Sequence, residues 1–106
     1  MKITVPRAAA ESGTLRVWLR RIPEASDTVH AFRLGPDGKP NVEVGRAEVY
    51  GRGHGSAATE RVMLLFRLRS QDGIVPVVAN EVLELLVETP GSEGYADVEL
   101  DILEIL

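Results

Sequence analysis

The sequence predicts an all-β fold: a single-domain, antiparallel Greek-key β-sandwich over residues 1–106, with a small β-barrel as the alternative. Apolar and polar residues alternate along most of the chain, which is the pattern of strands with one buried and one solvated face. Turn-forming residues separate these runs at roughly the 8–12-residue spacing of sandwiches and barrels. A chain of 106 residues suits one domain better than two.

The stretch that organises this prediction is residues 82–105, VLELLVETPGSEGYADVELDILEI. Two alternating runs flank the turn formers PGSEG, so they are expected to pair with each other as a β-hairpin with a longer loop. The outer face of this hairpin is acidic, and a solvated face is the usual outcome of such a pattern, ahead of calcium binding or acid–base chemistry. The acidic residues are Glu84, Glu88, Glu99, Asp101 and Glu104.

The first elements are short. Residues 2–5 (KITV) predict an edge strand, because Pro6 cannot donate to a strand ladder. Residues 7–13 (RAAAESG) are expected to be a connector, although they can form one helical turn. Residues 15–22 (LRVWLRRI) predict the first long strand, with one face apolar and the other basic.

The middle of the chain predicts two strands around the strongest turn signal. Residues 28–34 (TVHAFRL) are the first strand, residues 35–40 (GPDGKP) the turn, and residues 42–50 the second strand. Gly45 interrupts the second strand. A glycine inside a strand marks a β-bulge or the close approach of another backbone.

The following elements are less regular. Residues 51–59 (GRGHGSAAT) predict a glycine-rich loop, and residues 62–69 (VMLLFRLR) predict a central strand that is buried on both sides at its start. Residues 74–78 are expected to be extended, because Pro76 disfavours a central strand, with a helical turn near Asn80.

The composition excludes several functional classes. The net charge of −4 argues against a nucleic-acid partner, and no apolar run is long enough to span a bilayer. There is no cysteine and there are only two histidines, so a thiolate nucleophile and a multi-histidine metal site are ruled out within one chain. The start MKITVPRAAA lacks the apolar centre of a secretion signal, so we expect a cytoplasmic protein or a domain of a larger chain.

One candidate contact surface is visible in the sequence. Arg16, Trp18 and Arg20 share the basic face of the first long strand, and a tryptophan there either covers the edge of the core or contacts a partner. Tryptophan and arginine are enriched in protein interfaces, so these three residues are the predicted partner-binding residues.

The glycine-rich loop is the candidate ligand-binding segment. Arg52, Gly53, His54 and Gly55 can bring backbone and cationic groups to an anion, although a plain loop between two strands is the commoner outcome. The loop does not open a helix after a strand, so a dinucleotide site is not expected. His54 and Ser56 lack the third group and the oxyanion site that a nucleophile needs.

No other constellation supports catalysis. His30 is expected to be a satisfied core or rim histidine, because it shares a strand with Phe32 and Leu34. We therefore predict no catalytic residues, no cofactor and no metal, and a chain that is not an enzyme on its own.

Four stretches resemble the C-terminal β-sandwich domain of the tyrosinase and polyphenol oxidase family: TLRVWLRRI, VGRAEVYGRGHG, MLLFRLRSQDGIVPVVANEVLELLVETPG and DVELDILEIL. They cover about residues 15–106. The resemblance implies a non-catalytic domain that packs on a partner catalytic domain and shields its type-3 copper site. The copper-binding histidines belong to that partner. In some relatives one side chain reaches toward the copper as a placeholder, and Trp18, Phe32, Tyr50 and His54 are the residues of suitable type.

The alternative is a free-standing module that binds a ligand through residues 51–59 or associates with its own copies. Self-association is expected at an exposed edge strand, for which residues 2–5 are the candidate. In both hypotheses the partner is a protein, a ligand or a second copy, and neither involves nucleic acid or a membrane.

Overall fold

The computed structural model describes residues 1–20, 28–50, 62–68, 76–88, 91, 94–98 and 100–106, and the structural statements below concern these residues. The elements in chain order are β1 Lys2–Thr4, α1 Arg7–Ser12, β2 Thr14–Leu19, β3 Val29–Leu34, β4 Pro40–Tyr50, β5 Val62–Arg67, β6 Val82–Glu88, β7 Tyr95–Asp97 and β8 Ile102–Ile105. No helix among these residues is long and apolar enough to cross a membrane.

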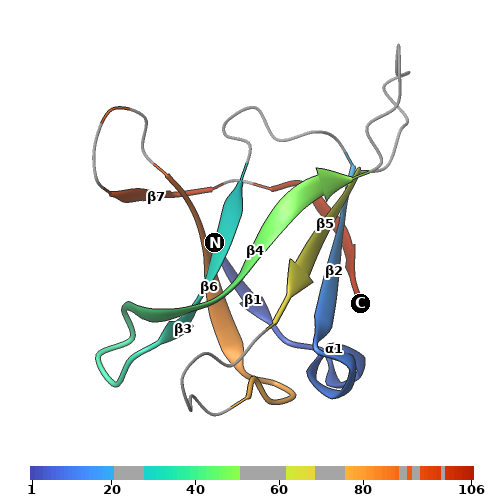
Figure 1. The fold of residues 1–106 in the computed structure, drawn as a ribbon, viewed down its shortest axis with the longest axis horizontal. Helices are drawn as coiled ribbons and strands as arrows, with labels where there is room; N and C mark the ends of the chain where they lie inside the picture. The colour runs from blue at the N-terminus through green and yellow to red at the C-terminus, as the bar shows by residue number, and fades with distance from the viewer. Residues whose placement is uncertain (21–27, 51–61, 69–75, 89–90, 92–93, 99) are drawn as a thin grey trace.

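The strands form one eight-stranded antiparallel sheet in the order β1-β6-β3-β4-β5-β2-β8, with β7 paired to β6 beside this path. The predicted all-β, antiparallel class is confirmed. The sheet curls into a half-barrel, with β3 and β6 on one side and β5, β2 and β8 on the other (Figure 1). The expected two-sheet sandwich is thus replaced by one continuous sheet, which is closer to the barrel alternative.

The long strand β4 explains why the sheet does not divide into two layers. Residues 40–47 of β4 pair with β3, and residues 47–50 pair with β5. Because one 11-residue strand takes part in both halves, it carries the sheet around the bend (Figure 1). The strand order also follows a Greek key, since β3, β4 and β5 are sequential neighbours and β6 returns to lie beside β3.

The predicted interruption at Gly45 is a β-bulge. Ala31 pairs with Gly45, whereas Phe32 pairs with Glu43, so Val44 is the additional residue. A Cβ atom on residue 45 would lie 3.1 Å from a backbone oxygen of β5. The bulge and the close approach of another backbone, which were alternatives in the sequence, are therefore both present.

The connector expected at residues 7–13 is instead the six-residue helix α1. Three consecutive alanines favour a helix, and Gly13 ends it in the left-handed conformation with φ of 74°. The Gly13 N–H donates to the Ala9 carbonyl oxygen at 2.8 Å. Ala9 is buried in the core, so the turn of helix is held by packing as well as by its cap.

The core is built from the inner faces of the strands, and its members are fully or almost fully buried. It consists mainly of Val, Leu and Ile, as the low aromatic content predicts, with Phe66 as the largest buried side chain. The central position expected for residues 62–69 is present in β5, which lies between β4 and β2. The expected burial of both faces at its start is not, because Met63 and Leu65 on the outer face are only half-buried. Near Asn80 the structure has a turn with a positive φ of 69° in place of the expected helical turn.

The predicted hairpin of residues 82–105 is present only in part, because its first strand pairs with residues 95–97 and not with residues 98–105. β6 pairs with β7, whereas β8 crosses the molecule and pairs with β2 at the opposite end of the sheet (Figure 1). Val98 and Leu100, which were expected in the second strand of the hairpin, are buried in the core on the way across. Burial of these two side chains competes with hairpin pairing, which is why alternation alone assigned the wrong partner.

Candidate functional site

The three residues predicted to form a contact surface lie together at β2. Arg16 and Trp18 are on the outer face of the sheet, because they alternate with residues of β2 that are buried in the core. Arg20 follows the strand, and its backbone N–H donates to the Asp101 carbonyl oxygen at 2.9 Å. Arg16 and Arg20 are exposed, and Trp18 is half-buried.

Neighbouring strands add apolar side chains to this face. Met63 of β5 pairs with Trp18, and Leu65 pairs with Arg16. Leu106 follows β8 and exchanges backbone hydrogen bonds of 2.7 and 2.9 Å with Arg16. Met63 and Leu65 are half-buried, and Leu106 is 46% exposed. Together with Arg16 and Trp18, these three residues form what we call the β2 outer patch, namely Arg16, Trp18, Met63, Leu65 and Leu106.

The glycine-rich loop lies outside the described residues. The predicted ligand-binding residues Arg52, Gly53, His54 and Gly55 all belong to that segment, and the side chain of Tyr50 is not described either. Of the placeholder candidates, Phe32 is 9% exposed.

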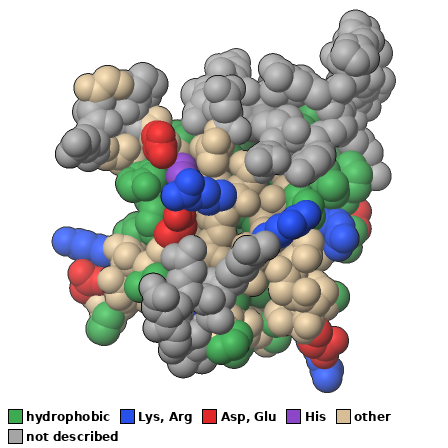
Figure 2. All heavy atoms as spheres, in the orientation of Figure 1, with side chains coloured by type: hydrophobic (Ala, Val, Ile, Leu, Met, Phe, Trp, Pro, Cys, Tyr) green, Lys and Arg blue, Asp and Glu red, His purple; other side chains and the backbone are tan. Residues whose placement is uncertain are grey.

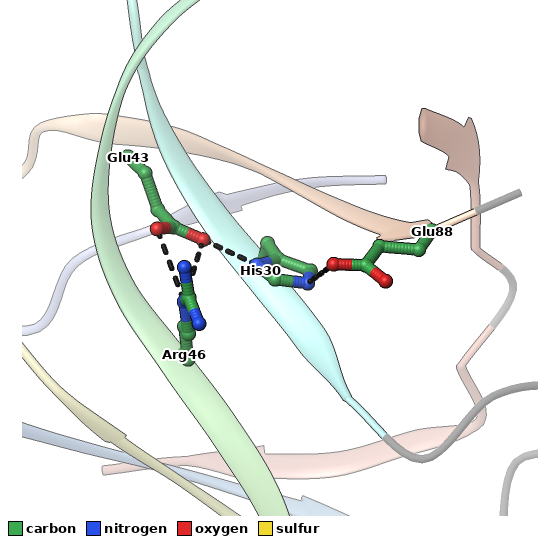
Figure 3. Close-up of polar contacts among 4 residues, drawn as sticks. All are labelled: His30, Glu43, Arg46 and Glu88. Carbon is green, nitrogen blue, oxygen red and sulfur yellow. Dashed lines mark hydrogen bonds and ion pairs between the residues drawn. The ribbon is translucent and has the colours of Figure 1, made fainter. Parts of the chain in front are cut away.

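A second group of polar residues surrounds His30 (Figure 3). The imidazole is 1% exposed, and its Nδ1 atom contacts a carboxylate oxygen of Glu43. The guanidinium Nε of Arg46 donates to both oxygens of that carboxylate, at 3.1 and 3.2 Å. On the other side, Nε2 of His30 lies 3.3 Å from Oε1 of Glu88. We call these four residues the histidine cluster.

The bulge in β4 creates the acidic half of this cluster. Glu43 and Arg46 are three positions apart, so they would point to opposite faces of a regular strand. The additional residue Val44 brings both side chains to the outer face, beside His30. The cluster therefore depends on a local irregularity that the period of a strand does not predict.

Aromatic rings complete the burial of the imidazole. Tyr95 of β7 packs edge-on against His30 and Phe32, with ring centroids 5.2 and 5.0 Å apart. Tyr95 is positioned by its pairing with Glu88 at the end of β6. On the face shown in Figure 2, a small histidine surface lies between basic and acidic side chains.

The two ring nitrogens have unequal partners. Nδ1 is hydrogen-bonded to Glu43, but Nε2 is buried and makes no hydrogen bond within the described part of the chain, since Glu88 is not aligned for one. A neutral imidazole has one N–H donor, and its other ring nitrogen is an acceptor, which a carboxylate cannot satisfy. The expected satisfied core histidine is thus buried as predicted, but only one of its nitrogens is satisfied.

The pair of His30 and Glu43 resembles part of an acid–base site, but the imidazole is buried. A carboxylate that orients an imidazole is the second half of many catalytic arrangements. Here the imidazole is 1% exposed, so a substrate atom has no direct path to Nε2. No group of three or more His, Cys, Asp or Glu residues that could hold a metal ion occurs in the described ranges.

A third polar contact joins the start of the chain to β7. The Met1 ammonium contacts the Asp97 carboxylate and lies 2.8 Å from Oε2 of Glu84. Burial by itself would lower the pKa of the ammonium, but the hydrogen bonds and charges of Asp97 and Glu84 outweigh it and raise that pKa above 8.0. The same hydrogen bond and the ammonium charge lower the pKa of Asp97 below 3.8.

Comparisons with family models, with curated proteins and with solved structures find no match to this chain. The β2 outer patch and the histidine cluster are the two features of the described residues that bear on function.

Proposed function

We propose that this chain is a non-catalytic β domain that acts by binding a protein partner, either a different protein or a second copy of itself, through the β2 outer patch. The observation that carries the proposal is the group of apolar side chains on the outer face of β5 and β2, which includes Trp18 and surrounds the exposed Arg16. The solvated outer face of an antiparallel sheet is normally made of polar residues. Apolar and aromatic side chains with arginine at that place have the composition of an interface core.

The resemblance to the tyrosinase and polyphenol oxidase family supplies a more specific proposal. In that case the partner is a catalytic domain, and the β2 outer patch covers the entrance of its type-3 copper site. Trp18 is the placeholder candidate that belongs to the patch. This part of the proposal depends on the resemblance alone.

The test is a comparison of bound proteins for three forms of the chain. Wild type, Trp18→Ala and Lys39→Ala are immobilised and exposed to the same cell extract, and retained proteins are identified by mass spectrometry. Lys39 is exposed at the β3–β4 turn, away from the patch, so Lys39→Ala is the matched control. Circular dichroism and a urea titration establish that each variant is folded.

We expect a protein that wild type and Lys39→Ala retain and that folded Trp18→Ala loses, with binding reproduced from purified components. Equal retention by all three folded forms, together with no Trp18-dependent self-association of the purified chain, would contradict the proposal. A retained oxidase that contains copper, and whose activity falls when the chain is added, would support the shielding role. A Trp18→Ala chain that is unfolded would assign Trp18 to the core.

A further inference from the structure

The strand β8 lies at the edge of the sheet that the described residues form. Among the described strands it is the last of the sheet, and it pairs only with β2. Leu106 exchanges both of its backbone hydrogen bonds with Arg16. Because backbone groups of successive residues in a strand point in opposite directions, the N–H and C=O of Ile105 point away from β2.

The side chains at this edge are mostly apolar. Leu103 is 41% exposed and Leu106 is 46% exposed, while Ile102 and Ile105 are only partly buried against the core. Natural edge strands are usually protected by charges, prolines or a covering segment. In β8 the only charged residue is Glu104, so this edge resembles a surface that pairs.

We propose that the partner of this surface is a second copy of the chain, which adds its own β8 antiparallel to β8 and continues the sheet across a twofold axis. The inference rests on the proposed function, because it names the partner of the β2 outer patch and extends that patch to the neighbouring edge. It differs from the sequence-based expectation, which placed self-association at residues 2–5.

Charge selects the register of this pairing. A twofold axis through Glu104 would place two glutamates directly opposite each other, which is destabilising. An axis through Ile105 instead lets Ile105 and the partner's Ile105 exchange both backbone hydrogen bonds. Glu104 then lies beside the partner's Leu106, so the two Glu104 side chains are no longer directly opposite each other.

The same register gives opposite charges on the outer face. Arg16 neighbours Leu106 across β2 and β8, and the partner's Glu104 lies on the far side of Leu106. Two strand spacings separate Arg16 from the partner's Glu104, about 10 Å, which these two long side chains span together above Leu106. By symmetry, the partner's Leu106 lies next to Glu104 in the row that contains Trp18.

The short length of β8 is the reason for including the β2 outer patch in the proposed interface. Stable interfaces bury about 800 Å² on each partner. Strand β8 has only 4 residues, so the side chains of β2 have to contribute contact area as well. Trp18 is the largest of them, and we therefore expect its removal to weaken the dimer.

The experiment begins with the solution mass of the full chain by light scattering over a dilution series. We expect twice 11.5 kDa at high concentration, with dissociation on dilution. Ile105→Pro removes an N–H that points away from β2, so it blocks the added strand without removing a hydrogen bond of the monomer. This variant is expected to have the monomer mass and to remain folded.

Cross-linking tests the register. The chain has no cysteine, so Ile105→Cys can form a disulfide only between copies. Opposed residues of a hydrogen-bonded antiparallel pair have Cα atoms about 5.5 Å apart, which a disulfide spans. Thr4→Cys on β1 is the matched control at the other end of the sheet. We expect a covalent dimer from Ile105→Cys and little from Thr4→Cys.

A charge exchange tests the cross-strand pair. Arg16→Glu and Glu104→Arg are each expected to raise the dissociation constant about tenfold, and the double variant is expected to restore most of the loss. Arg46→Glu, which lies in the histidine cluster, controls for net charge.

A wild-type chain that is monomeric at every concentration would overturn the inference, and so would equal cross-linking from Thr4→Cys and Ile105→Cys. A monomeric chain that retains a different protein through Trp18 would leave the proposed function standing without this inference. A cross-linked β8 dimer that Trp18→Ala does not weaken would contradict the role of the outer patch and support the edge pairing alone.

Discussion

Gly45 of β4 lies so close to Arg67 of β5 that a Cβ atom at position 45 would be 3.1 Å from the Arg67 carbonyl oxygen. We expect Gly45→Val to destabilise the fold by about 1–3 kcal/mol, because the added side chain pushes two paired strands apart. Gly45→Ala should lose less stability than Gly45→Val, because its side chain is smaller. The check is urea denaturation, with Asn41→Val at an exposed position of β4 as the control. Unchanged stability of Gly45→Val would contradict the close approach.

The two carboxylates next to His30 should differ in their contribution to stability. Glu43→Ala leaves Nδ1 of a buried imidazole without its acceptor, which costs about 1–3 kcal/mol. Glu88→Ala should cost well under that, because the Glu88 side chain is 67% exposed and is not aligned for a hydrogen bond. Glu43→Gln keeps an acceptor oxygen, so its loss of stability should lie between those of Glu43→Ala and Glu88→Ala. Equal losses for Glu43→Ala and Glu88→Ala, measured in urea, would argue against this assignment.

The cap of α1 gives a test of backbone conformation separate from packing. Gly13 has φ of 74°, and a Cβ atom there would lie 3.7 Å from the Leu68 carbonyl oxygen, an ordinary contact. Gly13→Ala should therefore cost about 1–2 kcal/mol through the left-handed conformation alone. Gly13→Asn should cost less, because asparagine adopts that conformation more readily. Thermal unfolding of the two variants measures the difference, and the opposite order would show that contact with Leu68 dominates.

The contact between the Met1 ammonium and Asp97 should make stability depend on pH at both ends of its range. The pKa of Asp97 is lowered, so its contribution is present above 3.8 and is lost as pH falls through the lowered value. The pKa of the ammonium is raised, so its contribution is present below 8.0 and is lost as pH rises through the raised value.

Asp97→Asn should therefore lower the Tm most between about pH 4 and pH 8, and the curves of wild type and variant should converge outside that range. The effect should be small, since the Asp97 side chain is 77% exposed. Acetylation of the amino terminus is the matched control and should reduce the effect of Asp97→Asn. A difference in Tm that is constant from acid to alkaline pH would show that Asp97 acts through something other than this ion pair.

Several elements follow from the sequence alone, because their signals are local. Alternation identified β5 and its buried face, and the bulge at Gly45 followed from a glycine inside an alternating run. The placement of Arg16 and Trp18 on one face of β2 has the same origin, since the period of a strand is 2. The edge position of β1 followed from Pro6.

Tertiary structure decided which strands pair and what surrounds His30. Alternation is the same whether β8 pairs with β6 or with β2, so it does not identify the partner. The choice depends on burial of Val98 and Leu100, which takes the chain across the core to the other end of the sheet. Likewise, Glu88 reaches His30 from β6, which is distant in sequence, and Glu43 reaches it from the next strand only because of the bulge in β4. Local periodicity contains no information on such contacts, because they arise only when the sheet curls and its strands find their neighbours.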